Sequence, residues 1–571
     1  MTTGQLIFIA VTFVGFTAMV ALISWWKTRD EDLNSQDGYF LAGRSLTAGV
    51  IAGSLMLTNL STEQLIGQSG QSFATNMGPM AWEATACFAL IILANVFLPK
   101  YLKAGVTTIP EFLEKRYDPM VKRIISILFL LGYLLTYLPT VLYSGALVFN
   151  QLFGIDEMLG VSQLTGVIVT AVAIGIIGAI YAIFGGLKAV AVSDTINGIG
   201  LIIGGFMVPV FAFIALGNGN FFDGLRDLVQ NLPSEKMTAL NPALAQAPMI
   251  PWPVLFTGMV VNNLFYWCTN QSIIQRTFGA KNLKEAQKGA IMTSFLKLVG
   301  PFFITICGLL SFRMAMTGAY GDQINKLMET SDLAYPMLVL HVMPKPLLGF
   351  FAAVLFGAIL SSFNSALNSS VTLYTLDIHR PMFNPTATDA HLVSVGKKFG
   401  TCLAAVSICV APVVSFAPSG LYDFLQECFG FYNVPIIAAV LLGFFTKRVP
   451  ANAVKISLVT HVVLYGASKF IVPRTIHYLY VLAVLFVLNI AIMLIYGKLR
   501  PRDTDFVLED AGAVDLTPWK YAKLASAISL ICLVGVYLLW SPIGLGSLSQ
   551  VHLPAGTGLD LASVMSALHL G

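Results

Sequence analysis

At residues 58–64 the sequence reads Thr58-Asn59-Leu60-Ser61-Thr62-Glu63-Gln64, a polar run inside an apolar stretch from about Leu46 to Phe73. A charged side chain at the centre of a bilayer costs about 2.5 to 3.5 kcal/mol on insertion scales, so a simple membrane anchor would carry only apolar residues here. The run nevertheless keeps Glu63 beside two amide side chains. We therefore interpret it as a solute-binding site within a membrane-spanning segment.

The composition of the whole chain is that of an integral membrane protein. Of 571 residues, 56% are hydrophobic and 11% are charged, whereas a soluble domain carries about 25% charged residues. The net charge of +4 is too small to indicate a nucleic-acid partner. We predict about 14 transmembrane helices, each near or above the roughly 20 residues that cross the hydrocarbon layer. The predicted spans lie near 5–26, 46–73, 79–99, 124–153, 163–184, 190–217, 252–275, 290–316, 346–376, 399–416, 420–445, 453–471, 475–497 and 521–546.

The distribution of Lys and Arg predicts the orientation. About three quarters of the 33 basic residues fall in every second connection between the predicted spans, which places those connections in the cytoplasm. Both chain ends are then outside, as an even number of spans requires. The first span is no cleaved signal peptide, because it is long, lacks a basic start and ends in the interfacial residues Trp25-Trp26-Lys27.

The sequence contains no pattern of an enzyme or of an ATP-driven pump. Its seven cysteines all fall within predicted spans and form no CxxC pair, so we expect them to pack as small apolar residues. The seven histidines are scattered and form neither HExxH nor a Ser/His/Asp set, and no GxxxxGK[ST] motif occurs. We therefore expect a protein that is not an enzyme.

A second polar interruption indicates an internal repeat. Cys268-Thr269-Asn270-Gln271 breaks the span 252–275 as the first run breaks 46–73. Broken helices at corresponding positions of two five-span halves are typical of inverted-repeat secondary transporters, here of the leucine-transporter type with broken first and sixth core helices. The predicted units are a flanking helix and cytoplasmic loop (1–45), the first repeat (46–217), an external loop (218–251), the second repeat (252–445), three flanking helices (446–546) and an external tail (547–571).

Several motifs occur together in order between about residue 38 and residue 445. They resemble the sodium/solute symporter family, and within it the sodium/glucose and sodium/galactose cotransporter branch. Their joint occurrence makes the resemblance specific, whereas the last hundred or so residues match mainly by span pattern. The motifs are Phe40-Leu41-Ala42-Gly43-Arg44, the run at 58–64, Tyr181-Ala182-Ile183-Phe184-Gly185-Gly186-Leu187-Lys188-Ala189, Tyr266-Trp267-Cys268-Thr269-Asn270-Gln271, Gln275-Arg276-Thr277, Ser361-Ser362, Asn368-Ser369 and Asp377-Ile378.

The resemblance implies a sugar site built from amides and a pair of charges. An amide both donates and accepts, as a sugar hydroxyl does, and charged groups make stronger hydrogen bonds. Position alone leaves open that Glu83 and Lys297 form a structural ion pair. The implied sugar-binding positions are Gln64, Glu83, Asn263, Lys297 and Gln426, with Asn59 supporting the unwound backbone or reaching the ligand.

Aromatic side chains are implied at the two ends of this site, because a flat ring stacks on the apolar face of a sugar. The inner gate matches Tyr266, with Trp267 next to it, and the outer lid matches Gln68, Trp82 and Tyr422. For Trp82 or Tyr422 taken alone, a packing or interfacial aromatic is the simpler interpretation. The family relatives carry methionine, tyrosine and phenylalanine at the three lid positions, a serine at Ala86 and a tyrosine at Phe265, which leaves the exact sugar open.

The resemblance also implies a sodium site. Its ligands would be the backbone of Leu57, Leu60 and Ala358 and the hydroxyls of Ser361 and Ser362, although small residues at 361–362 also suit plain helix packing. A second sodium, present in some relatives, would use Asp194, Ser361, Asn364 and Ser365, where the last two replace a pair of hydroxyl residues. Asp194 could equally line a sodium exit path or cap a helix over 190–217.

Taken together, the sequence predicts a sodium-coupled symporter that imports a galactose- or glucose-like monosaccharide by alternating access, in a bacterial inner membrane. Its predicted partners are the sugar, sodium and the lipid bilayer. One alternative is a family symporter for an inositol, a sialic acid or a small carboxylate. The other is a membrane sugar sensor that does not transport, against which the lack of a soluble signalling domain in the sequence argues.

Overall fold

The protein is a bundle of helices. The computed structural model describes residues 3–416, 421–554 and 556–568, so residue 420 of the predicted span 420–445 and residues 555 and 569–571 of the predicted tail lie outside the described residues. In these ranges the chain forms no β-strand, only isolated bridges. The helices are α1 (Thr3–Thr28), α2 (Gln36–Leu41), α3 (Ala48–Asn59), α4 (Thr62–Ala74), α5 (Ala81–Ala84), α6 (Ala86–Ile92), α7 (Leu98–Ala104), α8 (Ile109–Arg116), α9 (Pro119–Gly132), α10 (Leu138–Phe153), α11 (Ile155–Leu159), α12 (Gln163–Leu216), α13 (Phe221–Asn231), α14 (Gly258–Cys268), α15 (Gln271–Phe278), α16 (Leu283–Val299), α17 (Thr305–Met316), α18 (Ile324–Glu329), α19 (Ala334–Val342), α20 (Lys345–Thr372), α21 (Arg380–Met382), α22 (Asp389–Val410), α23 (Leu421–Phe429), α24 (Asn433–Phe445), α25 (Ala451–Ile471), α26 (Tyr478–Leu499), α27 (Ala522–Leu539) and α28 (Leu561–Ala567).

Within the described residues, eleven helices are long and apolar enough to cross a membrane, which makes the chain a multi-pass membrane protein. The pair formed by α23 and α24, bent by 48°, raises the number to 12 if it is one span. The predicted number of 14 also counts 46–73 and 252–275, which fold as pairs of shorter helices, so it stays a prediction. The spans are Ile7–Thr28, Gly78–Ala104, Pro119–Phe153, Gln163–Ile180, Gly186–Leu216, Leu283–Met316, Lys345–Met382, Asp389–Phe416, Ala451–Ile471, Tyr478–Leu499 and Ala522–Leu539.

Both polar interruptions are breaks in the helices. Between α3 and α4, Leu60 and Ser61 have extended backbone, with φ −86° and −129°. Between α14 and α15, Asn270 is extended (φ −69°, ψ 118°), and its side chain accepts a hydrogen bond from the backbone N–H of Ser272. Ser, Thr and Asn side chains compete with the helix for backbone groups, which explains why the chain unwinds at these two places.

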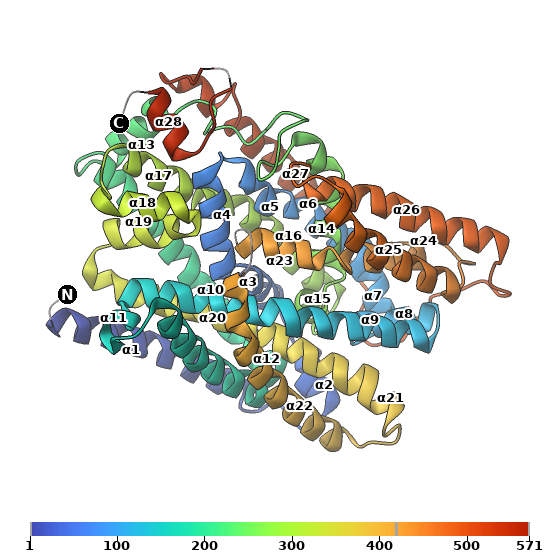
Figure 1. Cartoon of the computed structure of the whole chain (residues 1–571). Helices are drawn as coiled ribbons and strands as arrows, with labels where there is room; N and C mark the ends of the chain where they lie inside the picture. The colour runs from blue at the N-terminus through green and yellow to red at the C-terminus, as the bar shows by residue number, and fades with distance from the viewer. Residues whose placement is uncertain (1–2, 417–420, 555, 569–571) are drawn as a thin grey trace.

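Helix α20 lies near the centre of the bundle. It packs against α1, α3, α10 and α12, and α3 also packs against α12 and α16 (Figure 1). Both chain ends lie on the left of Figure 1, whereas α8 and α21 lie on its right. The two broken helices are therefore enclosed by the longer spans.

Several helices occur in connections where the sequence analysis expected none. These are α8, α13, α18, α19 and α28. These helices are short, and three of them start with a local side-chain cap. Thr108 accepts from the backbone N–H of Glu111 in α8, Asn220 from that of Phe222 in α13, and Asp560 from that of Ser563 in α28. The tail returns to the end of α13, because the N–H of Gln550 donates to Gln230 O at 2.9 Å.

Helix α12 covers two of the spans and changes direction at one glycine. Gly186 has φ +64° and ψ −178° inside the helix, a combination that is essentially restricted to glycine. A Cβ at this position would lie 3.1 Å from Leu33 Cδ2 and 3.3 Å from Tyr39 O. The kink between the two spans therefore depends on glycine.

We predict that Gly186→Ala destabilises the fold, because the strained backbone alone costs about 1 to 3 kcal/mol. The measurement is the thermal unfolding midpoint of the purified protein in detergent. Gly535→Ala is the matched control, because it also lies in a helix and nothing lies within 4 Å of its added Cβ. Equal midpoints for the two variants would contradict the assignment.

Candidate functional site

Two charges are buried together beside the first helix break. Lys297 on α16 forms an ion pair with Glu83 on α5, and the two side chains are 0% and 1% exposed. The Lys297 ammonium also donates to Asn59 Oδ1 at the end of α3, and it lies 5.3 Å from the ring centroid of Trp267 on α14. Gln68 on α4 donates to the other Glu83 oxygen at 3.0 Å. Five of the predicted substrate and gate residues therefore form one connected group.

The other predicted amides have different partners. Asn263 donates to Thr85 Oγ1 at 2.7 Å, and Gln426 accepts from Asn262 at 3.1 Å. Gln64 is 4% exposed, and its Oε1 is buried without a hydrogen-bond partner in the described part of the chain. Asn263, Gln426 and Gln64 are thus buried polar groups that make no hydrogen bond to the group around Lys297.

The predicted aromatic gate residues form two contacts. Trp82 on α5 and Tyr422 on α23 meet edge to face, with ring centroids 5.4 Å apart and an interplanar angle of 75°. Tyr266 and Trp267 meet in the same way, also at 5.4 Å. Trp82 and Tyr422 are each 4% exposed. The rings of each pair are therefore packed edge to face in the interior of the protein.

The end of α3 contacts α20 at the predicted sodium ligands. Ser362 donates to the carbonyl oxygen of Thr58 at 3.0 Å, and Leu57, Leu60 and Ala358 are fully buried beside this contact. The last four carbonyls of a helix have no intrahelical donor, so the break leaves hard oxygen ligands facing the α20 hydroxyls. This donor set fits a sodium ion.

The residues predicted for a second sodium also supply free oxygen atoms. In the described ranges, Asp194 Oδ1, Ser361 Oγ and Asn364 Oδ1 are buried without a hydrogen-bond partner. The hydroxyl of Ser365 already has a partner, because it shares a hydrogen bond of 3.1 Å with the hydroxyl of Thr58. Three of the four predicted residues therefore retain an acceptor for a cation.

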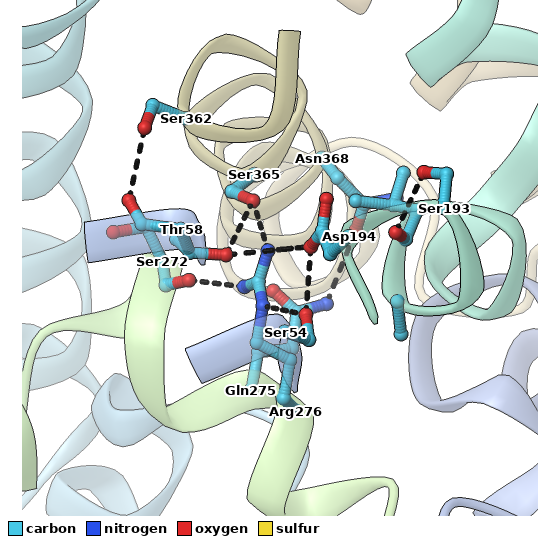
Figure 2. Close-up of polar contacts among 12 residues, drawn as sticks. Ser54, Thr58, Ser193, Asp194, Ser272, Gln275, Arg276, Ser362, Ser365 and Asn368 are labelled. Carbon is cyan, nitrogen blue, oxygen red and sulfur yellow. Dashed lines mark hydrogen bonds and ion pairs between the residues drawn. The ribbon is translucent and has the colours of Figure 1, made fainter. Parts of the chain in front are cut away.

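A buried arginine that belongs to the recognised Gln275-Arg276-Thr277 motif, but was not predicted as a site residue, connects both broken helices (Figure 2). Arg276 on α15 donates to Ser54 on α3 at 2.9 Å, bonds to Ser365 on α20, and lies 3.8 Å from Asp194 on α12. Asp194 accepts in turn from Ser54 at 2.7 Å and from Thr58 at 3.4 Å. The cluster of these five residues joins four helices.

Two predictions at this cluster are wrong. Arg276 was counted in a cytoplasmic connection, but it is fully buried near the end of α15. The hydropathy of the sequence does not distinguish an arginine in a loop from a buried arginine whose charge is neutralised by a carboxylate far away in the sequence. Asp194 does not cap a helix, because the second span of α12 starts at Gly186 and the helix-dipole effect is confined to the first turn. The signal that could have located Arg276 is its position beside Gln275, within the recognised motif.

Further polar contacts hold α15 against α20. Gln275 donates to Thr372 Oγ1 at 2.9 Å and to Asn368 Oδ1 at 3.3 Å, and it accepts from Ser369 at 2.8 Å. Gln275 and Arg276 both lie on α15, after the helix break. The second half of the broken α14–α15 pair is therefore fixed to α20 by side-chain hydrogen bonds.

We predict that Lys297→Met or Glu83→Gln alone lowers stability by about 3 to 5 kcal/mol, because each leaves one buried charge or strong polar group without its partner. The double variant, which removes both charges, should recover most of the loss. The measurement is the thermal unfolding midpoint in detergent for all four proteins. Single variants as stable as the wild type would show that the pair is not held in a low-dielectric interior.

The chain matches a known family over most of its length. Residues 39–459 match the sodium:solute symporter family. The uncharacterized symporter YidK of Escherichia coli (strain K12) is 47% identical over 529 residues, which cover 92% of this chain and 90% of YidK. A sodium/glucose cotransporter of Vibrio parahaemolyticus is 32% identical over 463 residues, which cover 79% of this chain and 83% of that protein.

Solved structures give the same fold. The substrate-bound, outward-open state of a Na⁺-coupled sialic acid symporter superposes with a TM-score of 0.73 at 18% identity, over 87% of this chain and 99% of the other. At this identity the likeness concerns the fold alone. Together with the sequence matches it leads to one conclusion: the chain belongs to the sodium:solute symporter family.

Proposed function

We propose that the protein is a sodium-coupled symporter that imports a galactose- or glucose-like monosaccharide. The observation that carries the proposal is the connected group of Asn59, Gln68, Glu83 and Lys297 beside Trp267, buried next to a helix break. A sugar offers hydroxyls that both donate and accept, and an apolar carbon face for the indole ring. The similarity to a sodium/glucose cotransporter supports this substrate class.

We assign substrate contact to Asn59, Gln64, Glu83, Asn263, Tyr266, Trp267, Lys297 and Gln426. Without a bound solute, the Glu83 carboxylate and the Lys297 ammonium neutralise each other. A sugar hydroxyl inserted between them would accept from Lys297 and donate to Glu83, which preserves both charge-assisted hydrogen bonds. The free Gln64 Oε1 is a further acceptor for a hydroxyl.

Sodium, as the co-transported ion, is assigned to the oxygens of Leu57, Leu60, Ala358, Ser361 and Ser362. The contact between Ser362 and the Thr58 carbonyl supports this assignment, because it joins α3 to α20 at the point where the ion would bind. The unpaired oxygens of Asp194, Ser361 and Asn364 support a second ion, and Ser365 would be its fourth ligand once it releases its hydrogen bond to Thr58.

The proposed cycle is alternating access between the repeats 46–217 and 252–445. Gln68, Trp82 and Tyr422 would form the outer gate and Tyr266 the inner one, and the contacts of Gln275 and Arg276 with α20 would have to break before release to the cytoplasm. Each sodium ion that crosses a potential of 100 mV supplies about 2.3 kcal/mol. A cyclic polyol is the second candidate substrate, because the human sodium/myo-inositol cotransporter 2 is 32% identical over 461 residues.

Uptake into proteoliposomes tests the function directly. Radiolabelled galactose, glucose and myo-inositol are offered with an inward gradient of sodium, potassium or choline chloride, and with a proton gradient as a fourth arm. The expected result is accumulation of a monosaccharide only with sodium. Uptake driven by protons would overturn the coupling ion. Binding without uptake in any arm would support the sensor instead.

We predict that Ser362→Ala raises the sodium concentration needed for half-maximal uptake and weakens sugar binding. Sodium and sugar share the break between α3 and α4, and a coupling free energy of about 1 to 3 kcal/mol must be equal in both directions. Sugar binding at equilibrium, titrated at several sodium concentrations, checks both effects. Ser370→Ala is the matched control, because among the described residues this α20 hydroxyl donates to Ala366 O within its own helix and to no other helix. Equal effects of both substitutions would remove Ser362 from the sodium site.

We predict that Gln64→Ala weakens sugar binding about tenfold or more while the protein stays folded, because a lost polar partner costs about 1 to 3 kcal/mol. The measurement is the dissociation constant of the transported sugar in saturating sodium, together with the unfolding midpoint. Gln323→Ala, at an exposed external position, is the control. An unchanged dissociation constant would exclude Gln64 from the sugar site.

A further inference from the structure

A basic hollow lies at the ends of two membrane-spanning helices. It has a volume of about 350 Å³, and three lysines and three phenylalanines line it. Lys100 and Lys103 come from α7, at the end of the span Gly78–Ala104, and Lys447 lies two residues after the end of α24. The hollow therefore lies where the hydrocarbon layer gives way to lipid headgroups. The phenylalanines are Phe444, Phe445 and Phe506.

The hollow combines an apolar wall with ammonium groups. The Nζ of Lys100 lies 4.0 Å from the ring centroid of Phe445 and 4.9 Å from that of Phe444. Phe445 is 63% exposed at the surface of the bundle, where lipid tails would contact it. A lysine that lies along phenyl rings and extends its charge outward is the arrangement typical of side chains at the membrane interface.

A second hollow adjoins the first at Lys447. It has a volume of about 380 Å³ and adds Arg448 and Lys498 to its lining. Asp505 is the one acidic side chain among the described residues that line either hollow. The two hollows together thus present five cations and one carboxylate.

The carboxylate of Asp505 does not neutralise all the basic side chains that line the two hollows. Asp505 accepts a hydrogen bond from Arg448 at 2.6 Å, and this bond lowers the pKa of the Asp505 carboxyl. The negative charge of Asp505 therefore neutralises mainly Arg448. Lys447 lies farther away, at 3.9 Å, and its side chain is 72% exposed. Among the described residues, Lys100, Lys103 and Lys498 take part in no ion pair. Three of the five cations therefore have no anionic partner among the described residues, and Lys447 has only the more distant contact with Asp505.

We propose that the two hollows bind the headgroup of an anionic phospholipid. The basic groups would neutralise its phosphate, while Phe444 and Phe445 contact its acyl chains. Basic pockets between transmembrane helices on the cytoplasmic side are suited to such headgroups. The paired hollows favour a lipid with two phosphates, such as cardiolipin, over one with a single phosphate. The general excess of basic residues in cytoplasmic loops explains the charge, but it does not explain a hollow lined by phenyl rings.

The test uses the full-length protein, delipidated in detergent and titrated with cardiolipin, phosphatidylglycerol, phosphatidylcholine or inorganic phosphate. Native mass spectrometry and the unfolding midpoint report binding. We expect cardiolipin to bind most tightly and phosphatidylcholine not to bind. The triple variant Lys100→Gln, Lys103→Gln, Lys447→Gln should need at least about tenfold more anionic lipid for half saturation, since each lysine near a phosphate contributes roughly fivefold.

The matched control carries the same loss of charge elsewhere on the predicted cytoplasmic side, as Lys281→Gln, Lys284→Gln, Lys398→Gln. It should bind anionic lipid as the wild type does. An equal loss in both triple variants would mean that only the overall charge attracts lipid and would overturn the site. Equal stabilisation by phosphatidylcholine, or full stabilisation by inorganic phosphate alone, would likewise overturn the assignment to an anionic phospholipid. None of these outcomes depends on which solute is transported.

Discussion

A charge inside a membrane protein must be neutralised by the protein itself, and Lys297 is the residue at which this constraint is most severe. Its ammonium is fully buried and holds Glu83 on α5 and Asn59 on α3, with Trp267 on α14 beside it. Four helices, two of them halves of broken pairs, are thus positioned by one cation. An isolated charge in low dielectric is strongly unfavourable, so these helices cannot separate at this point unless another polar group takes their place.

The same constraint acts a second time at Arg276. This guanidinium connects α15 to α3 and α20, and Asp194 on α12 balances its charge. The first broken helix therefore contributes to two ion-paired clusters, one at Asn59 and one at Ser54 and Thr58. Between the clusters lies the contact of Ser362 with the Thr58 carbonyl. An ion bound there would add to the forces that hold α3 against α20, which gives a physical basis for coupling an ion to a solute in one movement.

Charged side chains at the lipid-facing surface are neutralised in a different way from those in the interior. Inside, every cation described above has a partner on another helix. At the end of α7, Lys100 lies along the rings of Phe444 and Phe445, and among the described residues it takes part in no ion pair. Charges at this depth reach water and headgroups, so they need no internal partner. The protein thus places paired charges where the helices must stay together and unpaired charges where the bilayer supplies the counterion.

Local properties of the sequence determined the helical class, most of the spans, both helix breaks and the family. Apolar runs of about 20 residues and polar interruptions such as 58–64 determine local structure through neighbouring residues, so they can be recognised in the sequence without knowledge of the fold. The tertiary structure alone decided which charges pair. Arg276 was predicted in a connection and Asp194 as a possible cap, because no local pattern shows that a carboxylate on α12 reaches a guanidinium on α15. The number of spans also depends on tertiary structure, since helices as short as α14 and α15 remain in the bundle only because longer helices enclose them and satisfy their backbone groups.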